Sequence, residues 1–188
     1  MTKTEPAAMS KAVTSNKIVT SLKKLRLLRY PSANHNQMEE DDFANLSFVE
    51  REVLEFNLDM QQWLAGTVER SPDNFTVISS QLATGFGAIT SSGRHWRRDS
   101  MLTQLEQAWG VRGTEFVSTI LELRVIVQTA VLAAVSYEIH EVNNGTKAPV
   151  VKFVTAILAL NSRNRNNIEW LHYHEGGVVQ TSPAAKGE

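Results

Sequence analysis

The 188-residue sequence contains no cysteine, which excludes disulfide bonds, a thiolate nucleophile and a zinc site built on thiolates. It also lacks any apolar run approaching about 18 residues, so we expect no membrane span. Hydrophobic residues still make up 42% of the chain and charged residues 21%. This is the composition of an ordinary globular protein with one buried core.

Acidic residues are almost missing from the first 30 positions, which hold seven Lys and Arg residues and a single acid, Glu5. The rest of the chain holds 12 Lys and Arg residues against 19 Asp and Glu residues. The folded part is therefore acidic and repels phosphate backbones, so we expect it not to bind nucleic acid.

Residues 1–45 are predicted to be a basic leader followed by an acidic linker, with little fixed structure. Within them, residues 16–30 place apolar and basic side chains at helical spacing. This pattern is typical both of a solvated basic arm and of a mitochondrial presequence, and both interpretations stay open. We expect a cytoplasmic protein, or a mitochondrial one if residues 1–30 are a transit peptide.

Residues 47–65 form the clearest helical pattern. Ser47 followed by Glu50 is a capping-box signature, and Gly66 marks the end of the helix. Apolar residues recur between them at helical spacing: Val49, Val53, Phe56, Met60, Trp63 and Leu64. Trp63 and Met60 are interpreted mainly as core residues.

The following segment is ambiguous. Residues 75–80 fit either a strand or a short helix, and residues 82–92 favour a strand. The stretch that contains Gly85 and Gly87 lacks the third glycine and the Lys-Ser/Thr pair of a nucleotide-binding loop. They indicate a bent strand, and we expect no bound cofactor.

A short return strand is then expected at residues 94–97. Asp99 or Ser100 is expected to cap a helix that runs to Trp109 and ends at Gly110.

The C-terminal half is predicted to be an antiparallel meander, with strands at residues 115–128, 130–142, 150–161 and 168–175. Several of these strands are apolar on both faces. A sheet covered by helices on one face and still apolar on the other favours a partner, so we expect a homodimer through the sheet face.

The closing strand, IEWLHYHE at residues 168–175, carries the most informative side chains. Because side chains alternate along a strand, Trp170, His172 and His174 are expected on one face and Leu171 and Tyr173 on the other.

Three stretches together resemble the nuclear transport factor 2-like superfamily, and within it the SnoaL-like and calcium/calmodulin-dependent kinase association-like domains. They are VLEF to WLAG at residues 53–66, VSYE at residues 135–138 and the closing strand. The resemblance implies an α+β fold over residues 46–176, in which a curved antiparallel sheet is wrapped by N-terminal helices into a cystatin-like cone. Residues 177–188 are expected to be a flexible tail.

The same resemblance implies an apolar cavity inside the cone. One hypothesis is that a small, largely apolar molecule binds there, with isomerase-, dehydratase- or cyclase-like chemistry. The alternative is a non-catalytic homodimerising scaffold. For the first hypothesis, the candidate ligand-binding residues are Trp63, Tyr137, Trp170, His172 and His174.

Catalysis in such a pocket needs a base and a hydrogen-bond donor, for which the candidates are His172, Tyr137 and Asp59, followed by Glu138, His140 and His174. Two histidines on one strand face lie roughly 6.5 to 7 Å apart. His140 is the one obvious third ligand, and we expect no metal site.

Overall fold

The computed structural model describes residues 46–143, 149–160 and 168–180. The predictions for residues 1–45, and for residues 181–188 of the expected tail, fall outside this part of the chain. The elements, in chain order, are α3 (Phe48–Ala65), α4 (Pro72–Ser79), β1 (Leu82–Ile89), β2 (His95–Arg97), α5 (Arg98–Gln107), β3 (Val117–Gln128), β4 (Leu132–Val142), β5 (Val150–Leu160) and β6 (Ile168–Gln180). None of the described helices is long and apolar enough to cross a membrane.

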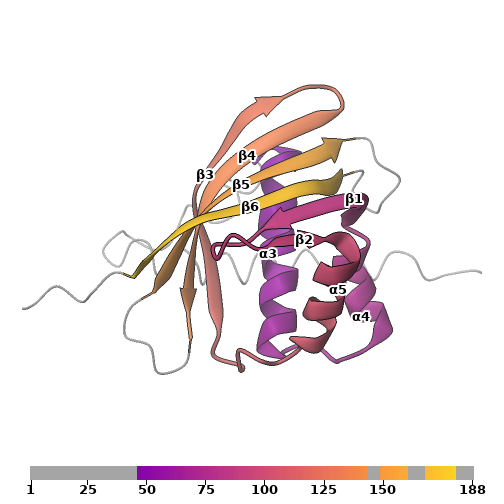
Figure 1. Ribbon diagram of the computed structural model, residues 1–188, viewed down its shortest axis with the longest axis vertical. Helices are drawn as coiled ribbons and strands as arrows, with labels where there is room; N and C mark the ends of the chain where they lie inside the picture. Colours follow the sequence, from indigo (N-terminus) through magenta and orange to yellow (C-terminus); the bar gives the residue numbers. More distant parts are fainter. Residues whose placement is uncertain (1–45, 144–148, 161–167, 181–188) are drawn as a thin grey trace, which may run out of the picture. The chain divides into compact units, whose positions relative to one another are not determined.

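The six strands form one sheet in the order β2-β1-β6-β5-β4-β3. The predicted meander from β3 to β6 is confirmed, and every pair of neighbours is antiparallel except β1 and β6, which run parallel. Figure 1 shows the strands curving around α3 and α5, which lie on one side of the sheet. We call the side covered by the helices the inner face and the opposite side the outer face. The predicted α+β class is thus confirmed, with a mixed sheet.

Helix α3 begins and ends where its sequence predicts. The Ser47 side chain accepts a hydrogen bond from Glu50 N, and the Glu50 side chain accepts one from Ser47 N, which completes the capping box. At the other end Gly66 adopts a left-handed conformation with φ 69°. Gly110 N and Arg112 N donate to the carbonyls of Trp63 and Leu64, at 3.0 and 2.9 Å. The C-terminus of α3 therefore fixes the segment that carries Arg112.

The two shorter helices begin earlier than their sequence signals indicate. The ambiguous segment forms α4, in which Pro72 starts the helix and the Ser71 side chain caps it by accepting from Asn74 N. Helix α5 begins at Arg98, so the predicted cap at Asp99 or Ser100 is wrong. Instead the Arg98 guanidinium donates to the carbonyls of Leu82 and Ser79, both at 3.0 Å. These tertiary contacts fix the start of α5 without a side-chain cap.

Strand β6 contains the irregularity that matters most for function. Trp170 pairs with Leu158 and His172 with Ile157, so the register shifts by one residue at Leu171. Leu158 is fully buried on the inner face, whereas its neighbour Ile157 points to the outer face. The prediction that Trp170, His172 and His174 share a face is therefore wrong, because a bulge inserts one residue and reverses the alternation.

The same strand runs to Gln180, four residues past the boundary expected at 176. A second register shift lies between its pairs with Lys152 and Phe153. On β3, Glu122 has a φ of 51° and lies within another register shift, between Leu121 and Arg124. Such irregularities bend strands, which agrees with the curvature of this sheet (Figure 1).

We expect Gly66→Ala to lower the free energy of unfolding by about 2 kcal/mol or more, because a side chain there is disfavoured at positive φ. The added Cβ would also lie 2.9 Å from the Gly110 Cα. Urea unfolding measures the effect. Gly85→Ala is the control, because no atom lies within 4 Å of its added Cβ, and we expect a change within about 0.5 kcal/mol. Equal losses for the two variants would contradict this account of the α3 terminus.

Candidate functional site

A cavity of about 80 Å³ lies between the inner face of the sheet and the helices. Its walls come from α3, β1, α5, β4 and β6, and nearly all are apolar or aromatic. The lining residues are Phe56, Asn57, Met60, Leu82, Phe86, Met101, Tyr137, Ile139, Trp170 and Tyr173. The Phe56 and Trp170 rings lie 4.4 Å apart, between centroids, so an aromatic pair forms part of the wall.

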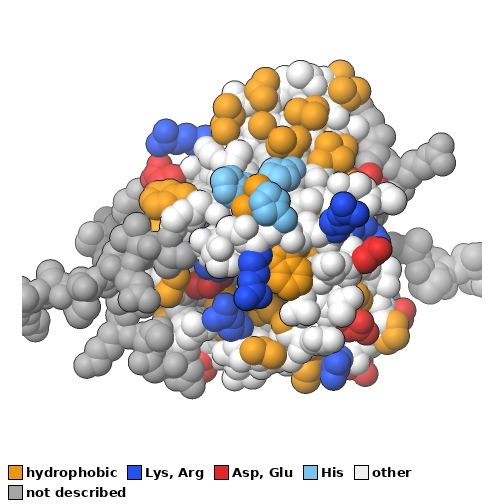
Figure 2. Space-filling view, viewed as in Figure 1, with side chains coloured by type: hydrophobic (Ala, Val, Ile, Leu, Met, Phe, Trp, Pro, Cys, Tyr) orange, Lys and Arg blue, Asp and Glu red, His pale blue; other side chains and the backbone are white. Residues whose placement is uncertain are grey.

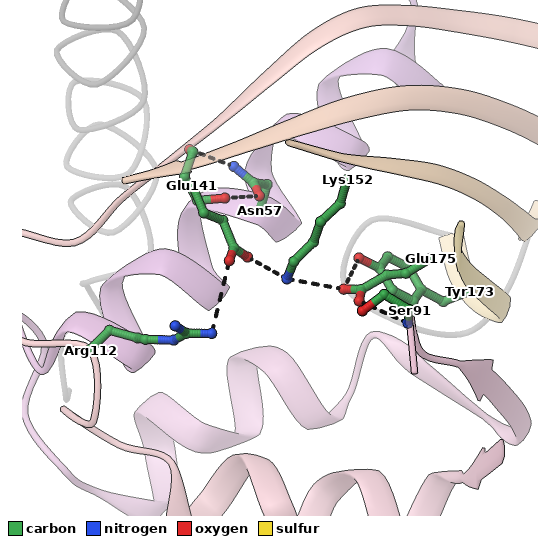
Figure 3. Close-up of polar contacts among 8 residues, drawn as sticks. Asn57, Ser91, Arg112, Glu141, Lys152, Tyr173 and Glu175 are labelled. Carbon is green, nitrogen blue, oxygen red and sulfur yellow. Dashed lines mark hydrogen bonds and ion pairs between the residues drawn. The ribbon is translucent and has the colours of Figure 1, made fainter. Parts of the chain in front are cut away.

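Charged side chains from three adjacent strands meet beside this cavity. Lys152 of β5 lies between Glu141 of β4 and Glu175 of β6, with Nζ 2.8 Å from Glu141 Oε1 and 3.5 Å from Glu175 Oε1. Figure 3 shows Lys152 reaching between the two carboxylates. Only 11 to 16% of each of these three side chains is exposed. Charges this far from water are stable only when paired.

Arg112 adds a second cation to the cluster. Its Nη2 lies 3.9 Å from Glu141 Oε2, and its guanidinium lies over the Phe116 ring at 5.5 Å. We call Arg112, Glu141, Lys152 and Glu175 the charged cluster. It holds two positive and two negative side chains, so its formal charge is balanced.

Tyr173 connects the charged cluster to the cavity. Its hydroxyl donates to Glu175 Oε1 at 3.0 Å while its ring lines the cavity. The other carboxylate oxygen of Glu175 accepts from the backbone N–H of Ser91 at 3.4 Å. The Glu175 carboxylate is thus oriented by a phenol, an ammonium group and a backbone amide (Figure 3).

Burial raises the pKa of Tyr137 and of Tyr173 above the ordinary tyrosine value, and the negative charge of Glu175 adds to both shifts. For Tyr173 the neighbouring Tyr137 is the second contribution, and Glu141 a smaller one. Both phenols therefore keep their protons at neutral pH and remain hydrogen-bond donors. The Tyr173 hydroxyl already donates to Glu175, so Tyr137 is the phenol of this pair that can donate a hydrogen bond to a bound oxygen.

On the helix side, Asn57 fixes the wall of the cavity to the sheet. Asn57 Nδ2 donates to Ser118 O at 3.0 Å, and Ser118 Oγ bonds to Asn57 Oδ1 at 2.9 Å. Gln61, one turn further along α3, accepts from Ser118 N at 2.9 Å. These bonds hold α3 against β3.

Of the predicted ligand-binding residues, Tyr137 and Trp170 line the cavity. Trp63 is fully buried elsewhere in the core, where its Nε1–H donates to Leu105 O and its ring packs on Phe75. Asp59, a predicted catalytic residue, accepts from Gln81 Nε2 at 3.1 Å and does not line the cavity.

The predicted histidines lie on the outer face. His172 pairs with Gly87 of β1, which pairs in turn with Arg97 of β2. In the same way, His174 pairs with Ile89, which pairs with His95. Figure 2 shows histidine side chains gathered on this surface.

His140 also lies away from the cavity and bonds to Glu138 at 2.9 Å. Nowhere in the described part of the chain do three His, Asp or Glu side chains come close enough to hold a metal ion.

Sequence reasoning did not select the charged cluster. Lys152 is the one charged residue within the apolar strand β5. Glu141 lies near the end of β4, and Glu175 lies in the middle of β6. A lysine in such a strand is a signal of a buried ion pair, because Lys is almost never buried unless it is paired. Which carboxylates pair with Lys152 depends on the register of the neighbouring strands.

Comparison with known proteins identifies the fold. No protein-family model and no curated protein sequence matches this chain. A crystal structure of an NTF-2 like protein of unknown function from Pseudomonas aeruginosa matches with a TM-score of 0.63 and 15% identity, over 72% of this chain and 100% of the other. The fold is nuclear transport factor 2-like.

Two further structures with this fold are described as candidate enzymes. A candidate scytalone dehydratase from Novosphingobium aromaticivorans matches with a TM-score of 0.54 and 8% identity, over 80% of this chain and 100% of its own. A candidate ketosteroid isomerase from Shewanella frigidimarina matches with a TM-score of 0.50 and 13% identity, over 69% of this chain and 95% of its own. At such identities the likeness is one of fold.

We expect Lys152→Met to lower the free energy of unfolding by about 3 kcal/mol, because two buried carboxylates lose their shared cation. Urea unfolding at neutral pH measures the loss. Arg124→Met is the matched control, because the Arg124 and Glu122 side chains are 74% and 54% exposed and such pairs contribute about 0.5 kcal/mol or less. A loss for Lys152→Met no larger than that of the control would show that the charged cluster does not stabilise the fold.

Proposed function

We propose that this protein binds a small, largely apolar molecule in the cavity between α3, α5 and the inner face of the sheet. The observation that carries the proposal is a cavity of about 80 Å³ with almost wholly apolar walls, placed beside buried polar groups. Known ligand sites combine apolar walls with a few fixed polar groups in this way. A protein that used its fold only as a scaffold has no need of such a cavity.

The groups beside the cavity are suited to proton-transfer chemistry of the isomerase or dehydratase type. Tyr137 supplies a hydrogen-bond donor, and Glu175 supplies a carboxylate held in place by Tyr173 and Lys152. Such reactions need a donor for a developing oxyanion and a group that moves a proton. The structures described as a candidate dehydratase and a candidate isomerase support this class through their shared fold.

Ile139→Phe tests the proposal by filling the cavity from β4. We expect native mass spectrometry of protein purified from its own cells to show a retained small molecule in the wild type and none in the variant. Xenon, which binds dry apolar cavities, should shift NMR signals of the lining residues in the wild type only.

Val142→Phe is the control, because it adds a ring to the same strand at a position 37% exposed. It should keep both the retained molecule and the xenon shifts. An identical retained mass in Ile139→Phe would place the ligand outside the cavity and refute the proposal.

A second function, homodimerisation through the outer face, is favoured by a separate observation. Large apolar side chains remain exposed there or at the hairpin beside it, namely Phe153, Ile126, Val127 and Val131 at 47, 61, 48 and 66%. Figure 2 shows hydrophobic side chains gathered over the ends of β3, β4 and β5. An exposed apolar surface of this kind is typical of an interface.

We expect sedimentation analysis at micromolar concentration to give a dimer for the wild type and a monomer for Phe153→Lys. Phe153 pairs with Glu138 on β4, so a lysine there gains an opposite charge and the fold should persist. Val111→Lys changes an apolar residue that is 71% exposed but lies outside the strands, and it should stay dimeric. A wild-type monomer would rule out this interface.

A further inference from the structure

A histidine and an arginine flank a glycine on the outer face of the sheet, at the edge opposite β3. His172 of β6 pairs with Gly87 of β1, which pairs with Arg97 of β2. Trp96 packs against the core, so its neighbour Arg97 points to the outer face. Because Gly87 has no side chain, only backbone separates His172 from Arg97. We call these three residues the anion row.

The next row of paired residues adds two more imidazoles. His174 pairs with Ile89, which pairs with His95. His95, Arg97 and His174 are exposed, and His172 is partly exposed. Figure 2 shows histidine side chains gathered on this face, with Lys and Arg side chains nearby. None of the ion pairs that the described residues form involves Arg97. Its guanidinium is therefore available to an anion.

Glycine backbone forms the floor between these side chains. Gly85 and Gly87 lie on the outer face of β1, because Phe86 between them is buried in the core. A Cβ added at Gly85 would meet no atom within 4 Å, and one added at Gly87 would lie 3.8 Å from His172 Nδ1. A ring nitrogen of His172 thus borders the space that a side chain of residue 87 would enter. That space can hold a small group instead.

The width of the anion row favours a tetrahedral anion. Neighbouring strands lie about 4.8 Å apart, so the backbones at His172 and Arg97 are separated by about 10 Å across β1. A carboxylate that binds Arg97 with both oxygens has none left for His172. A phosphate monoester has three terminal oxygens. Two of them can accept from the guanidinium while the third accepts from the imidazole.

The charge of the whole domain limits the size of the ligand. Residues 31–188 hold 12 Lys and Arg residues against 19 Asp and Glu residues, so a long polyanion is repelled. A single phosphate group requires only the cations beside it. The surroundings therefore fit one phosphate on a small molecule and not a nucleic acid chain.

We propose that the anion row binds the phosphate group of a small phosphate monoester, with Arg97 and His172 as its direct ligands. His95 and His174 add positive charge when they are protonated. This site lies on the outer face and does not use the cavity. The apolar residues considered above for a dimer belong to β3, its hairpin and β5. The proposal therefore goes beyond both functions proposed above.

Methyl phosphate, acetate and a short single-stranded DNA without a terminal phosphate test the proposal. Each is titrated into the full chain at about pH 6 and equal ionic strength, and binding is followed in ¹H–¹⁵N NMR spectra. Methyl phosphate should shift the backbone amide signals of Gly87, Arg97 and His172 in a saturable way. We expect acetate to leave these signals in place and the DNA to bind more weakly than methyl phosphate.

Two variants locate the site. Arg97→Gln should weaken methyl phosphate binding about five- to tenfold, because a charge-assisted pair of hydrogen bonds is lost. Gly87→Val should abolish binding by filling the floor while every charge stays in place, and valine suits a strand. Arg124→Gln is the matched control, since it removes the same charge from a side chain that is 74% exposed on the edge strand β3. It should keep the affinity within about twofold, and circular dichroism establishes that each variant is folded.

Sulfate, which keeps both charges between about pH 6 and pH 8, tests the part of the histidines. The titratable and charged side chains around the anion row are His172 and His174 of β6 and His95 and Arg97 of β2, whereas the outward side chains of β1 and β5 are uncharged. Glu169, on the same face of β6, precedes His172 by three positions. Histidines gain charge as the pH falls through this range, so sulfate should bind more tightly at about pH 6 than at about pH 8.

Several results would overturn the proposal. An absence of shifts with methyl phosphate, or binding unchanged by Gly87→Val and Arg97→Gln, would remove the site from the anion row. Acetate binding as tight as that of methyl phosphate would overturn the assignment to phosphate, and tighter binding of the DNA would overturn the small ligand. Equal sulfate affinity at the two pH values would exclude the histidines. Retention of a molecule in the cavity is measured separately, so these failures are distinct from failure of the proposed function.

Discussion

The register of β6 against β5 decides which side chains face the helices, and the rest of the site depends on it. The extra residue at Leu171 places Trp170 and Tyr173 on the same inner face, although they are three positions apart. Without the bulge, strand alternation would bring only one of the two into the cavity. The aromatic wall, the inward position of Tyr173 and Glu175, and the outward position of His172 all follow from this one irregularity.

The same register brings the charged cluster together. Glu141, Lys152 and Glu175 come from three neighbouring strands, and each enters the inner face near one end of the sheet. Arg112 is added by a different route, because its segment is bound to the C-terminal carbonyls of α3. The cluster therefore depends on both the sheet and the first helix. Its balanced charge lets it remain nearly buried beside an apolar cavity.

Cavity and cluster have complementary roles in the chemistry that we propose. The apolar walls of the cavity strengthen each hydrogen bond made inside it. The charged cluster orients the Glu175 carboxylate and supplies a local electric field without adding a net charge. The nuclear transport factor 2-like fold is shared by structures described as candidate enzymes and by structures of unknown function, so the function of this chain depends on the residues of its own site and not on the fold.

Local sequence determined a large part of the architecture. The capping box, apolar spacing and terminal glycine predicted α3, and alternating strands with turn residues predicted the meander, because these signals act between residues close in the chain. Tyr137 and Trp170, named from the sequence as ligand-binding residues, both line the cavity, and their binding role stays a prediction.

Tertiary structure alone decided the rest. Alternation predicted that His172 and His174 would face the cavity, whereas a bulge, which depends on pairing with a distant strand, turned them outward. The start of α5 was set by Arg98 contacts with α4 and β1 and not by a local cap. The pairing of Lys152 with Glu141 and Glu175 depends on the register of three strands. Local patterns specify which elements form, and only the packing of those elements specifies which side chains meet.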